Sequence, residues 1–469
     1  MLRQEKILVA QVALILWIFI AIAMFAVLSP LRAFLLTYVI GYLLLPVEVV
    51  GDNTFVGSIY LTQSLRIDKL TACNLAALLG TLIFAPHLIQ RYRLHWVDAA
   101  YFIATAGLFL TSLVNGLGAK DGLSQGVEML RQFLPLMLLS RLYLTTASSL
   151  YEAMRAIIGG AFVYAFVAVA EWRLSPFLHN LLYGYFQHSF DQFMRYSHFR
   201  PVGFLRHALE MSFFLGTASA MAGWLWYRKL LTPLWGTIPP WGVLLTLVCG
   251  LALTMTYSGY AAFLLLVSVL CLLVLMRSRW VLLLLPVMAV FWMTGRYTNQ
   301  IDASLLLNTT NYFDADRSES LQYRLEAERA NIDDASHHLL LGKGANGIAR
   351  EDGGGFVRAV DAWWLIEITF YGLVGIVGWY MIWGSGIVDS IRRWHQLTPD
   401  LQTLAAIIAL MVGAQFIDFL FNSFPSPFLL MLDMGLLSTL RFYKPMPAAS
   451  PMPATWPVDE LQMVPEVMP

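Results

Sequence analysis

The sequence predicts an all-α polytopic integral membrane protein with about 12–13 transmembrane helices. Three observations lead to this class: 58% of the residues are hydrophobic, only 13% are charged, and the apolar residues form uninterrupted runs of roughly 17–22 residues. In soluble domains about a quarter of the residues are charged, so a soluble globular protein is excluded. Two long polar segments interrupt the apolar runs, and both are expected on the outer face of the membrane.

The apolar runs are expected to be helices, because lipid cannot satisfy the backbone groups of an open chain. A closed β-barrel would show segments of about ten residues with strict alternation, whereas these runs are continuous and rich in Leu, Ala and Gly. The first run is too long for the core of a signal peptide, and we expect it to be retained as a span. The candidate spans are residues 7–28, 31–47, 70–88, 97–114, 127–144, 152–171, 207–226, 240–256, 259–276, 280–294, 361–385, 402–421 and 424–441.

Short basic loops predict the orientation, because cytoplasmic loops are enriched in Lys and Arg. The loops that fit this rule together carry Arg91 with Arg93, Arg141, Arg228 with Lys229, Arg277 with Arg279, Arg392 with Arg393, and Arg441 with Lys444. Thirteen full spans would place Arg3 and Lys6 outside, against the rule. Either one early segment does not cross, or the N-terminus is external.

The chain accordingly divides into six parts. They are N-terminal transmembrane helices 1–171, an outer loop 172–206, central transmembrane helices 207–294, a large outer loop 295–360 with a short amphipathic helix, C-terminal transmembrane helices 361–441, and a Pro-rich tail 442–469. The tail has many prolines and few large apolar side chains, so we expect it to be disordered.

Charge balance and cysteine placement exclude several functions. Lys+Arg and Asp+Glu number 30 each, so no strong field recruits nucleic acid. The three cysteines lie inside apolar runs and lack the spacing of a disulfide framework or a zinc site. His337 and His338 are adjacent rather than four residues apart, which disfavours a metal site on a helix. We therefore expect neither a metal nor a cofactor.

The first outer loop is unusually rich in arginine and histidine, interleaved with aromatic residues. Excess Arg on the outer side opposes the positive-inside rule and favours a specific anionic ligand, and a guanidinium suits phosphate because it donates two charge-assisted hydrogen bonds. The alternative is a basic loop in the headgroup layer with an aromatic belt. The candidate residues of this loop and its end are Arg200, Arg206, His207 and Tyr196.

The second outer loop contains a predicted helix and a glycine-rich turn. Arg324 has Glu328 four residues later as its natural helical partner. Gly342-Lys343 is not a phosphate-binding P-loop, because no glycine precedes it at the required spacing and no Ser or Thr follows. The loop ends at Asp361, which serves as a base with a raised pKa or as a helix cap. On the fifth span, Glu128 and Arg131 pair with each other or face a polar cavity.

Four motifs, in this order and spacing, resemble the superfamily of O-antigen ligases and O-antigen or exopolysaccharide polymerases. They are Arg200-Pro-Val-Gly-Phe, Thr256-Tyr-Ser-Gly, Arg324 ahead of Leu341-Gly-Lys-Gly, and the block from Asp361 to Gly375 with Glu367 and Gly372-Leu-Val-Gly. The likeness covers about residues 195–385. It departs at Asp361-Ala, where ligases and many polymerases place a His, often followed by Asn. This departure favours an exopolysaccharide-type polymerase over a typical ligase.

The resemblance implies a glycosyltransferase at the outer face of a bacterial inner membrane. Its substrate would be a polyprenyl-diphosphate-linked oligosaccharide, with a flippase and chain-length or export proteins as further partners. Arg200 and Arg324, helped by Arg206 and Arg131, would bind the diphosphate without a metal. Asp361 would accept the proton of the acceptor hydroxyl or orient it, with His337 or His338 as substitutes. The other expected substrate contacts are His207, Glu367, Tyr196, Trp363 and Trp364, of which the aromatic side chains would stack on sugars.

Three other functions remain as alternatives. The first is ligase-type transfer to a different acceptor. The second is a transporter or flippase, for which a dozen spans is a common size, although carriers place ionisable groups near the membrane midplane and here only Asp418 and Asp433 fit. The third is a structural subunit of an export complex. The sugar, the linkage and the oligomeric state do not follow from the sequence.

Overall fold

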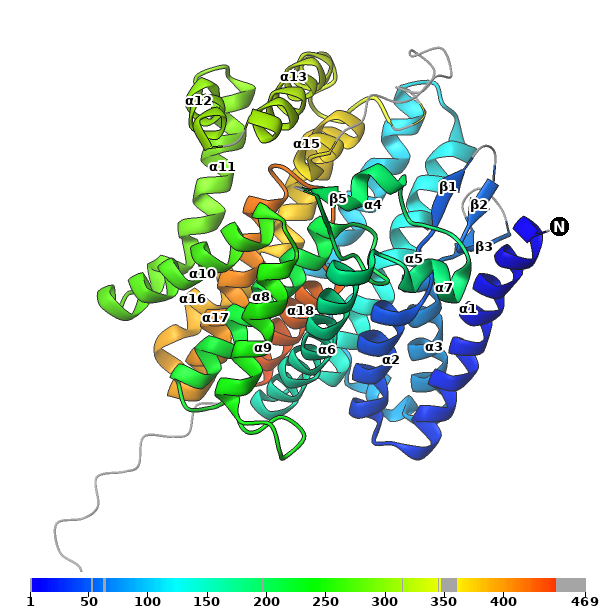
Figure 1. The fold of residues 1–469 in the computed structure, drawn as a ribbon, viewed down its shortest axis with the longest axis vertical. Helices are drawn as coiled ribbons and strands as arrows, with labels where there is room; N and C mark the ends of the chain where they lie inside the picture. Colours follow the sequence, from blue (N-terminus) through cyan, green and yellow to red (C-terminus); the bar gives the residue numbers. More distant parts are fainter. Residues whose placement is uncertain are drawn as a thin grey trace, which may run out of the picture.

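The structure, a computed structural model, describes residues 2–51, 54–61, 65–195, 197–313, 315–344, 346 and 361–443. Helices dominate it (Figure 1). The α-helices are α1 (Leu2–Val27), α2 (Pro30–Leu44), α3 (Lys69–Phe84), α4 (Trp96–Val114), α5 (Ala119–Tyr143), α6 (Ala147–Leu174), α7 (Leu178–Tyr183), α8 (Ala208–Tyr227), α9 (Pro240–Leu253), α10 (Tyr257–Met276), α11 (Leu284–Tyr297), α12 (Ser304–Phe313), α13 (Ala315–His337), α15 (Trp363–Trp383), α16 (Ser385–Arg393), α17 (Pro399–Asp418) and α18 (Pro427–Phe442).

Short elements connect these helices. The 3-10 helices are η1 (Pro86–Arg91), η2 (Phe190–Phe193), η3 (Arg279–Leu283) and η4 (Trp394–Gln396). Three antiparallel hairpins pair β1 (Val49–Gly51) with β2 (Thr54–Val56), β3 (Ile59–Tyr60) with β4 (Arg66–Ile67), and β5 (Met194–Arg195) with β6 (His198–Phe199).

Each of the thirteen predicted spans coincides with a helix. By length and composition, seven helices in the described part of the chain can cross a membrane: α1, α4, α6, α10, α11 with η3, α15 and α17. The helices α2, α3 and α9 are apolar but shorter. The all-α membrane fold is confirmed at this level, and the total of 12–13 crossings stays a prediction. The Pro-rich tail lies largely outside the described residues.

Local sequence signals set where the helices begin. The Asp68 carboxylate caps α3 by accepting a hydrogen bond from the backbone N–H of Thr71 at 2.8 Å. Thr146 caps α6 in the same way through Ser149. Proline stands in the first turn of α2, α9, α17 and α18, where its missing N–H removes no helical hydrogen bond.

The core of the protein surrounds α17 and α18. In α17, 83% of the residues in the apolar window are buried, against 28% in α1. Almost every side chain of α18 is also buried. The outer helices keep large apolar side chains exposed, as expected for surfaces that face lipid.

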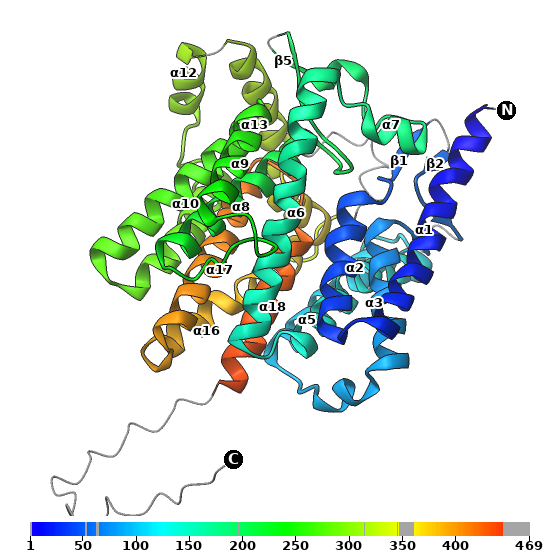
Figure 2. The same ribbon diagram turned by 60° about the horizontal axis from the view of Figure 1, so that its bottom comes forward.

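The connections gather at two ends of the molecule. The basic end holds Arg93, Arg141 and Arg441. The guanidiniums of Arg141 and Arg441 both donate hydrogen bonds to the Arg93 carbonyl. The loop end holds the three hairpins, α7, α12 and α13 (Figure 2). Gln11 of α1 donates a hydrogen bond to the Ser58 carbonyl between β2 and β3, so the N-terminal part of α1 also lies at the loop end. Of the two sequence-based possibilities, an N-terminus on the side of the outer loops agrees with this arrangement.

Helix α15 breaks at Gly372, which has φ +66°. The chain from Leu339 to Gly344 lies in the break and supplies hydrogen bonds to its backbone. Leu373 N–H donates to the Leu339 carbonyl at 2.8 Å, and Lys343 N–H donates to the Thr369 carbonyl at 2.9 Å. A Cβ on Gly372 would lie 2.5 Å from the Leu340 carbonyl carbon, so only glycine allows this contact.

We expect Gly372→Ala to destabilise the protein more than Gly236→Ala does. Both glycines have positive φ, but a Cβ on Gly236 meets nothing within 4 Å. Gly236→Ala should therefore cost about 1 kcal/mol of backbone strain, and Gly372→Ala about 1–3 kcal/mol more for the steric overlap. Thermal denaturation of the purified variants in one detergent measures the difference. Equal melting temperatures would show that the break does not depend on this close contact.

Candidate functional site

The loop before α8 is fixed by a buried carboxylate. Glu171, at the end of α6, is fully buried and accepts hydrogen bonds from the backbone N–H groups of Val202 at 2.8 Å and Gly203 at 2.7 Å. Gly203 has φ +60°, and a Cβ there would lie 3.0 Å from the Tyr164 ring. The backbone conformation and the close Tyr164 ring therefore both favour glycine at this position of the Arg200-Pro-Val-Gly-Phe motif. The loop holds Arg200 and Arg206 at fixed places on either side.

Arg200 reaches the break between α9 and α10. Its side chain is 6% exposed, and its Nη2 donates to the Thr256 hydroxyl at 3.2 Å. Its Nη1 donates to the Gln192 carbonyl at 3.4 Å. Two motifs that are 56 residues apart in the sequence thus meet in one contact.

His207 caps α8 and lies beside Arg200 and Arg206. Its Nδ1 accepts a hydrogen bond from the Leu209 N–H at 3.0 Å, which leaves the ring proton on Nε2. The ring stacks on Phe424, with centroids 5.6 Å apart. The Nε2–H can donate, but the capped Nδ1 does not act as a base.

Arg206 carries a charge with no counterion in direct contact. Its backbone N–H donates to Glu210 at 2.8 Å, but across the described residues its guanidinium has no hydrogen bond or ion pair. Burial alone would lower the pKa of Arg206, but Tyr42 and Glu210 nearby raise it above its ordinary value. The guanidinium remains a cation that is available to an anionic ligand.

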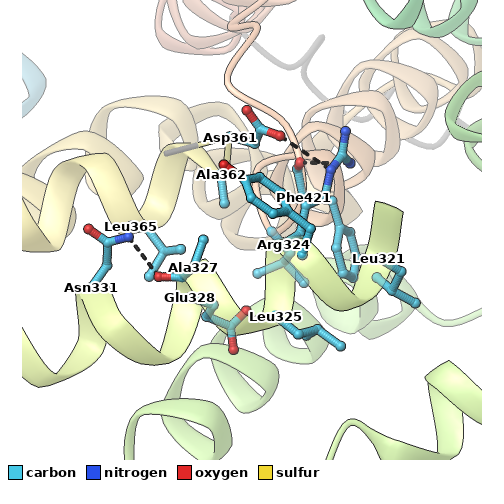
Figure 3. A pocket seen from close by; sticks show the side chains of 12 residues that line it. Leu321, Arg324, Leu325, Ala327, Glu328, Asn331, Asp361, Ala362, Leu365 and Phe421 are labelled. Atoms are coloured by element: carbon cyan, nitrogen blue, oxygen red, sulfur yellow. Dashed lines mark hydrogen bonds and ion pairs between the residues drawn. The ribbon is translucent and has the colours of Figure 1, made fainter. Parts of the chain in front are cut away.

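Arg324 and Asp361 form an ion pair at the loop end (Figure 3). The Nε of Arg324 on α13 lies 3.3 Å from the Oδ2 of Asp361, which directly precedes α15. The Arg324 Nη1 also donates to the Phe421 carbonyl at 3.3 Å. These groups line a small pocket that is open to solvent. Asp361 does not cap α15, whose N-cap is Ala362.

The predicted pairing of Arg324 with Glu328 is wrong. Glu328 forms a buried ion pair with Arg296 of α11, and Figure 3 shows its carboxylate pointing away from the Arg324 guanidinium. The local four-residue spacing was therefore overridden by a tertiary contact. Arg324 remains available to Asp361 and to the pocket.

The turn between α17 and α18 brings the two groups of residues together. Phe421 accepts from Arg324, Asn422 accepts from the Trp363 N–H at 3.1 Å, and Phe424 stacks on His207. The charges of Arg200 and Arg324 both act on His207. Arg200 and His207 thus lie near one turn with Arg324 and Asp361, although the sequence separates the two pairs by more than a hundred residues. We define these four residues as the candidate site.

Arg131 does not belong to this group. Its guanidinium is bound by Asp68 at 2.8 Å and by Glu128 at 2.6 Å, and its side chain is 6% exposed. Burial alone would raise the pKa of Asp68, but Arg131 and the Thr71 N–H lower it below its usual value. With these two carboxylates bound, the Arg131 guanidinium has no open face for a phosphate. Its predicted role in substrate binding is therefore not supported. The predicted Glu128–Arg131 pair is confirmed.

Several other expected substrate contacts lie elsewhere. Trp364 is fully buried, and Trp363 packs between Trp379 and Phe419, so Trp364 has no face for a sugar and Trp363 has little. Glu367 is 7% exposed within α15. His337 and His338 end α13, about 20 Å along the helix from Arg324, which is too far to replace Asp361. Tyr196 lies outside the described residues.

Glu210 is a site residue that the sequence reasoning missed. It is 8% exposed, its Oε1 accepts from the Tyr42 hydroxyl at 2.5 Å, and it lines a second pocket with Asp418. The signal was an acidic residue inside a span, which is costly in lipid and therefore marks function. No group of three or more potential metal ligands occurs among the residues searched, which are the described ones.

No protein-family model matches the chain, and a search of the curated proteins finds no match.

Proposed function

We propose that this protein is a membrane glycosyltransferase that polymerises polyprenyl-diphosphate-linked oligosaccharides, of the exopolysaccharide-polymerase type that its motifs resemble. The observation that carries the proposal is that Arg200 and Arg324 lie with Asp361 near the α17–α18 turn. Guanidiniums bind diphosphate oxygens bidentately, and a carboxylate beside them supplies a base. Under this proposal the loop end faces the exterior of a bacterial inner membrane.

The proposed step is a nucleophilic substitution at the anomeric carbon of the donor sugar. The acceptor hydroxyl oxygen forms the new glycosidic bond, while the bond from the anomeric carbon to the diphosphate oxygen breaks. The proton of the hydroxyl passes to the Asp361 carboxylate, and the electron pair leaves with the polyprenyl diphosphate. Arg200, Arg206 and Arg324 stabilise the negative charge that develops on this leaving group.

The Arg324–Asp361 ion pair gives the site a resting state. Both side chains are part-exposed, at 29% and 49%, so their attraction is screened and contributes about 0–1 kcal/mol. A diphosphate that binds Arg324 takes the place of the carboxylate at the guanidinium. Asp361 is then released toward the acceptor hydroxyl. Binding of the donor thereby frees the base that the reaction needs.

Transport remains the alternative from another class, and one observation bears on it. Asp418 is held by Asn422 at 2.6 Å and lines a pocket with Glu210 and Tyr42, at the end of α17 rather than midway along it. Coupled carriers usually place their ionisable groups near the membrane midplane. The position of Asp418 beside the candidate site therefore favours the enzyme.

Arg200→Gln should lower the polymerisation rate at least about a hundredfold while the protein still inserts in the membrane, because a group that stabilises the leaving diphosphate is lost. The assay supplies a lipid-diphosphate-linked oligosaccharide from the host to the reconstituted protein and resolves the products on a carbohydrate gel. The matched control is Arg173→Gln, an exposed arginine at the end of α6. A ladder from the Arg200→Gln protein equal to that of the unchanged protein would refute the role. Loss of function in Asp418→Asn alone would favour transport.

Asp361→Asn should also lower the rate at least about a hundredfold, because the amide cannot accept the hydroxyl proton. Its melting temperature should stay close to that of the unchanged protein, since a part-exposed ion pair contributes little to stability. Asp361→Glu should recover part of the activity. Full polymer length and yield from Asp361→Asn would show that another group, or none, is the base.

A further inference from the structure

A separate polar pocket lies at the basic end, away from the candidate site. Its walls come from η1 and the loop after it, from the end of α5 and from the end of α18. It is shallow and open to solvent, and its lining residues include Arg91, Arg93, His95, Arg141 and Arg441. The proposed polymerase chemistry makes no use of it.

One ion pair forms the rigid floor of this pocket. Arg141 is 6% exposed and pairs with Asp98 of α4, while its Nη1 donates to the Tyr92 hydroxyl at 2.6 Å. The Arg141 Nη2 donates to the Arg93 carbonyl at 2.8 Å, which fixes the loop after η1. The charge of Arg141 is therefore already balanced, and its contacts hold the walls in place.

The remaining guanidiniums of the pocket have no acidic partner. Arg441 donates to the carbonyls of Arg93 at 3.2 Å and Leu94 at 2.8 Å, which orients it without neutralising it. Arg91 and Arg93 are exposed, and within the described chain no carboxylate lies within 4 Å of either guanidinium. Three guanidiniums that make no ion pair within the described part of the chain thus line one small pocket.

The other titratable groups that face the pocket do not cancel this charge. Burial lowers the pKa of His95, against the opposing effect of Asp389, so the ring is neutral at pH 7. The His95 Nδ1 accepts from the Val97 N–H, which leaves the proton on Nε2, and this nitrogen lies 4.0 Å from the Asp389 Oδ2. Four arginines against Asp98 and Asp389 leave a net charge of two positive units.

Exposed apolar side chains lie next to these cations. Leu94 is 76% exposed and follows Arg93 directly, and Phe442, 41% exposed, follows Arg441. At the end of α3, just before η1, Ile83 and Phe84 are 58% and 41% exposed. Exposed apolar side chains thus stand close to these cations along the chain, and Phe442 is itself part of the pocket wall.

We propose that this pocket binds the phosphate headgroup of an anionic phospholipid, with its acyl chains along the exposed apolar residues of α3 and the α3–α4 connection. Arginines suit a phosphate diester because each guanidinium donates two parallel hydrogen bonds. Basic pockets between membrane helices commonly hold anionic headgroups. The same phosphate chemistry in a soluble ion would lack the apolar contacts.

The test uses native mass spectrometry of the full-length protein in detergent, titrated with phosphatidylglycerol. Arg91→Gln/Arg93→Gln should weaken binding at least about tenfold, since each basic residue near a headgroup contributes appreciably. Neither side chain makes an internal ion pair, so this variant should stay folded. The matched control is Lys229→Gln/Arg277→Gln, which removes two positive charges from exposed positions in other predicted basic loops.

Phosphatidylcholine and inorganic phosphate complete the experiment. We expect weak binding of phosphatidylcholine, which is zwitterionic, and no displacement of phosphatidylglycerol by millimolar phosphate. An equal loss of binding in both double variants would show diffuse charge attraction rather than a site. Displacement by inorganic phosphate, or equal binding of the two lipids, would also overturn the proposal.

Discussion

The break in α15 at Gly372 is the constraint on which the loop end depends. Backbone groups that a broken helix frees inside a membrane protein need partners that lipid does not supply. The chain from Leu339 to Gly344 supplies them, and the contact is so close that glycine is required at Gly372. This contact anchors the end of α13 to α15. Arg324 on α13 is consequently held beside Asp361 at the start of α15.

A second constraint acts on the other half of the candidate site. The carboxylate of Glu171 accepts two backbone hydrogen bonds from the loop that follows Arg200, and this fixes Arg200 on one side and His207 on the other. The α17–α18 turn then lies against both halves through Phe421 and Phe424. Backbone hydrogen bonds thus hold the loop that carries Arg200, and the ion pair with Asp361 holds Arg324. Buried cations such as Arg200 bind an anion readily, but removing them from water lowers the stability of the protein.

The sequence predicted the helices well, because long apolar runs admit few structures in lipid. It also predicted Arg200, Arg324 and Asp361 as candidates, but it could not predict their partners. Local spacing assigned Glu328 to Arg324, whereas a tertiary contact gives Glu328 to Arg296. The sequence also did not show which side chains are buried. Burial depends on which face of a helix packs inward, and Trp364 lies on such a face. Arg131 was an apparent ligand-binding residue, but its second counterion, Asp68, comes from a separate segment.

We propose that Arg200 and Arg324 bind one diphosphate together, near the α17–α18 turn. The most direct test is the dissociation constant of a short-chain polyprenyl diphosphate, measured with purified unchanged protein, Arg200→Gln, Arg324→Gln and the double variant. We predict that each single change weakens binding about tenfold or more, and that the double variant departs from additivity because both side chains hold one ligand. Unaltered affinity in either single variant would contradict a shared diphosphate site.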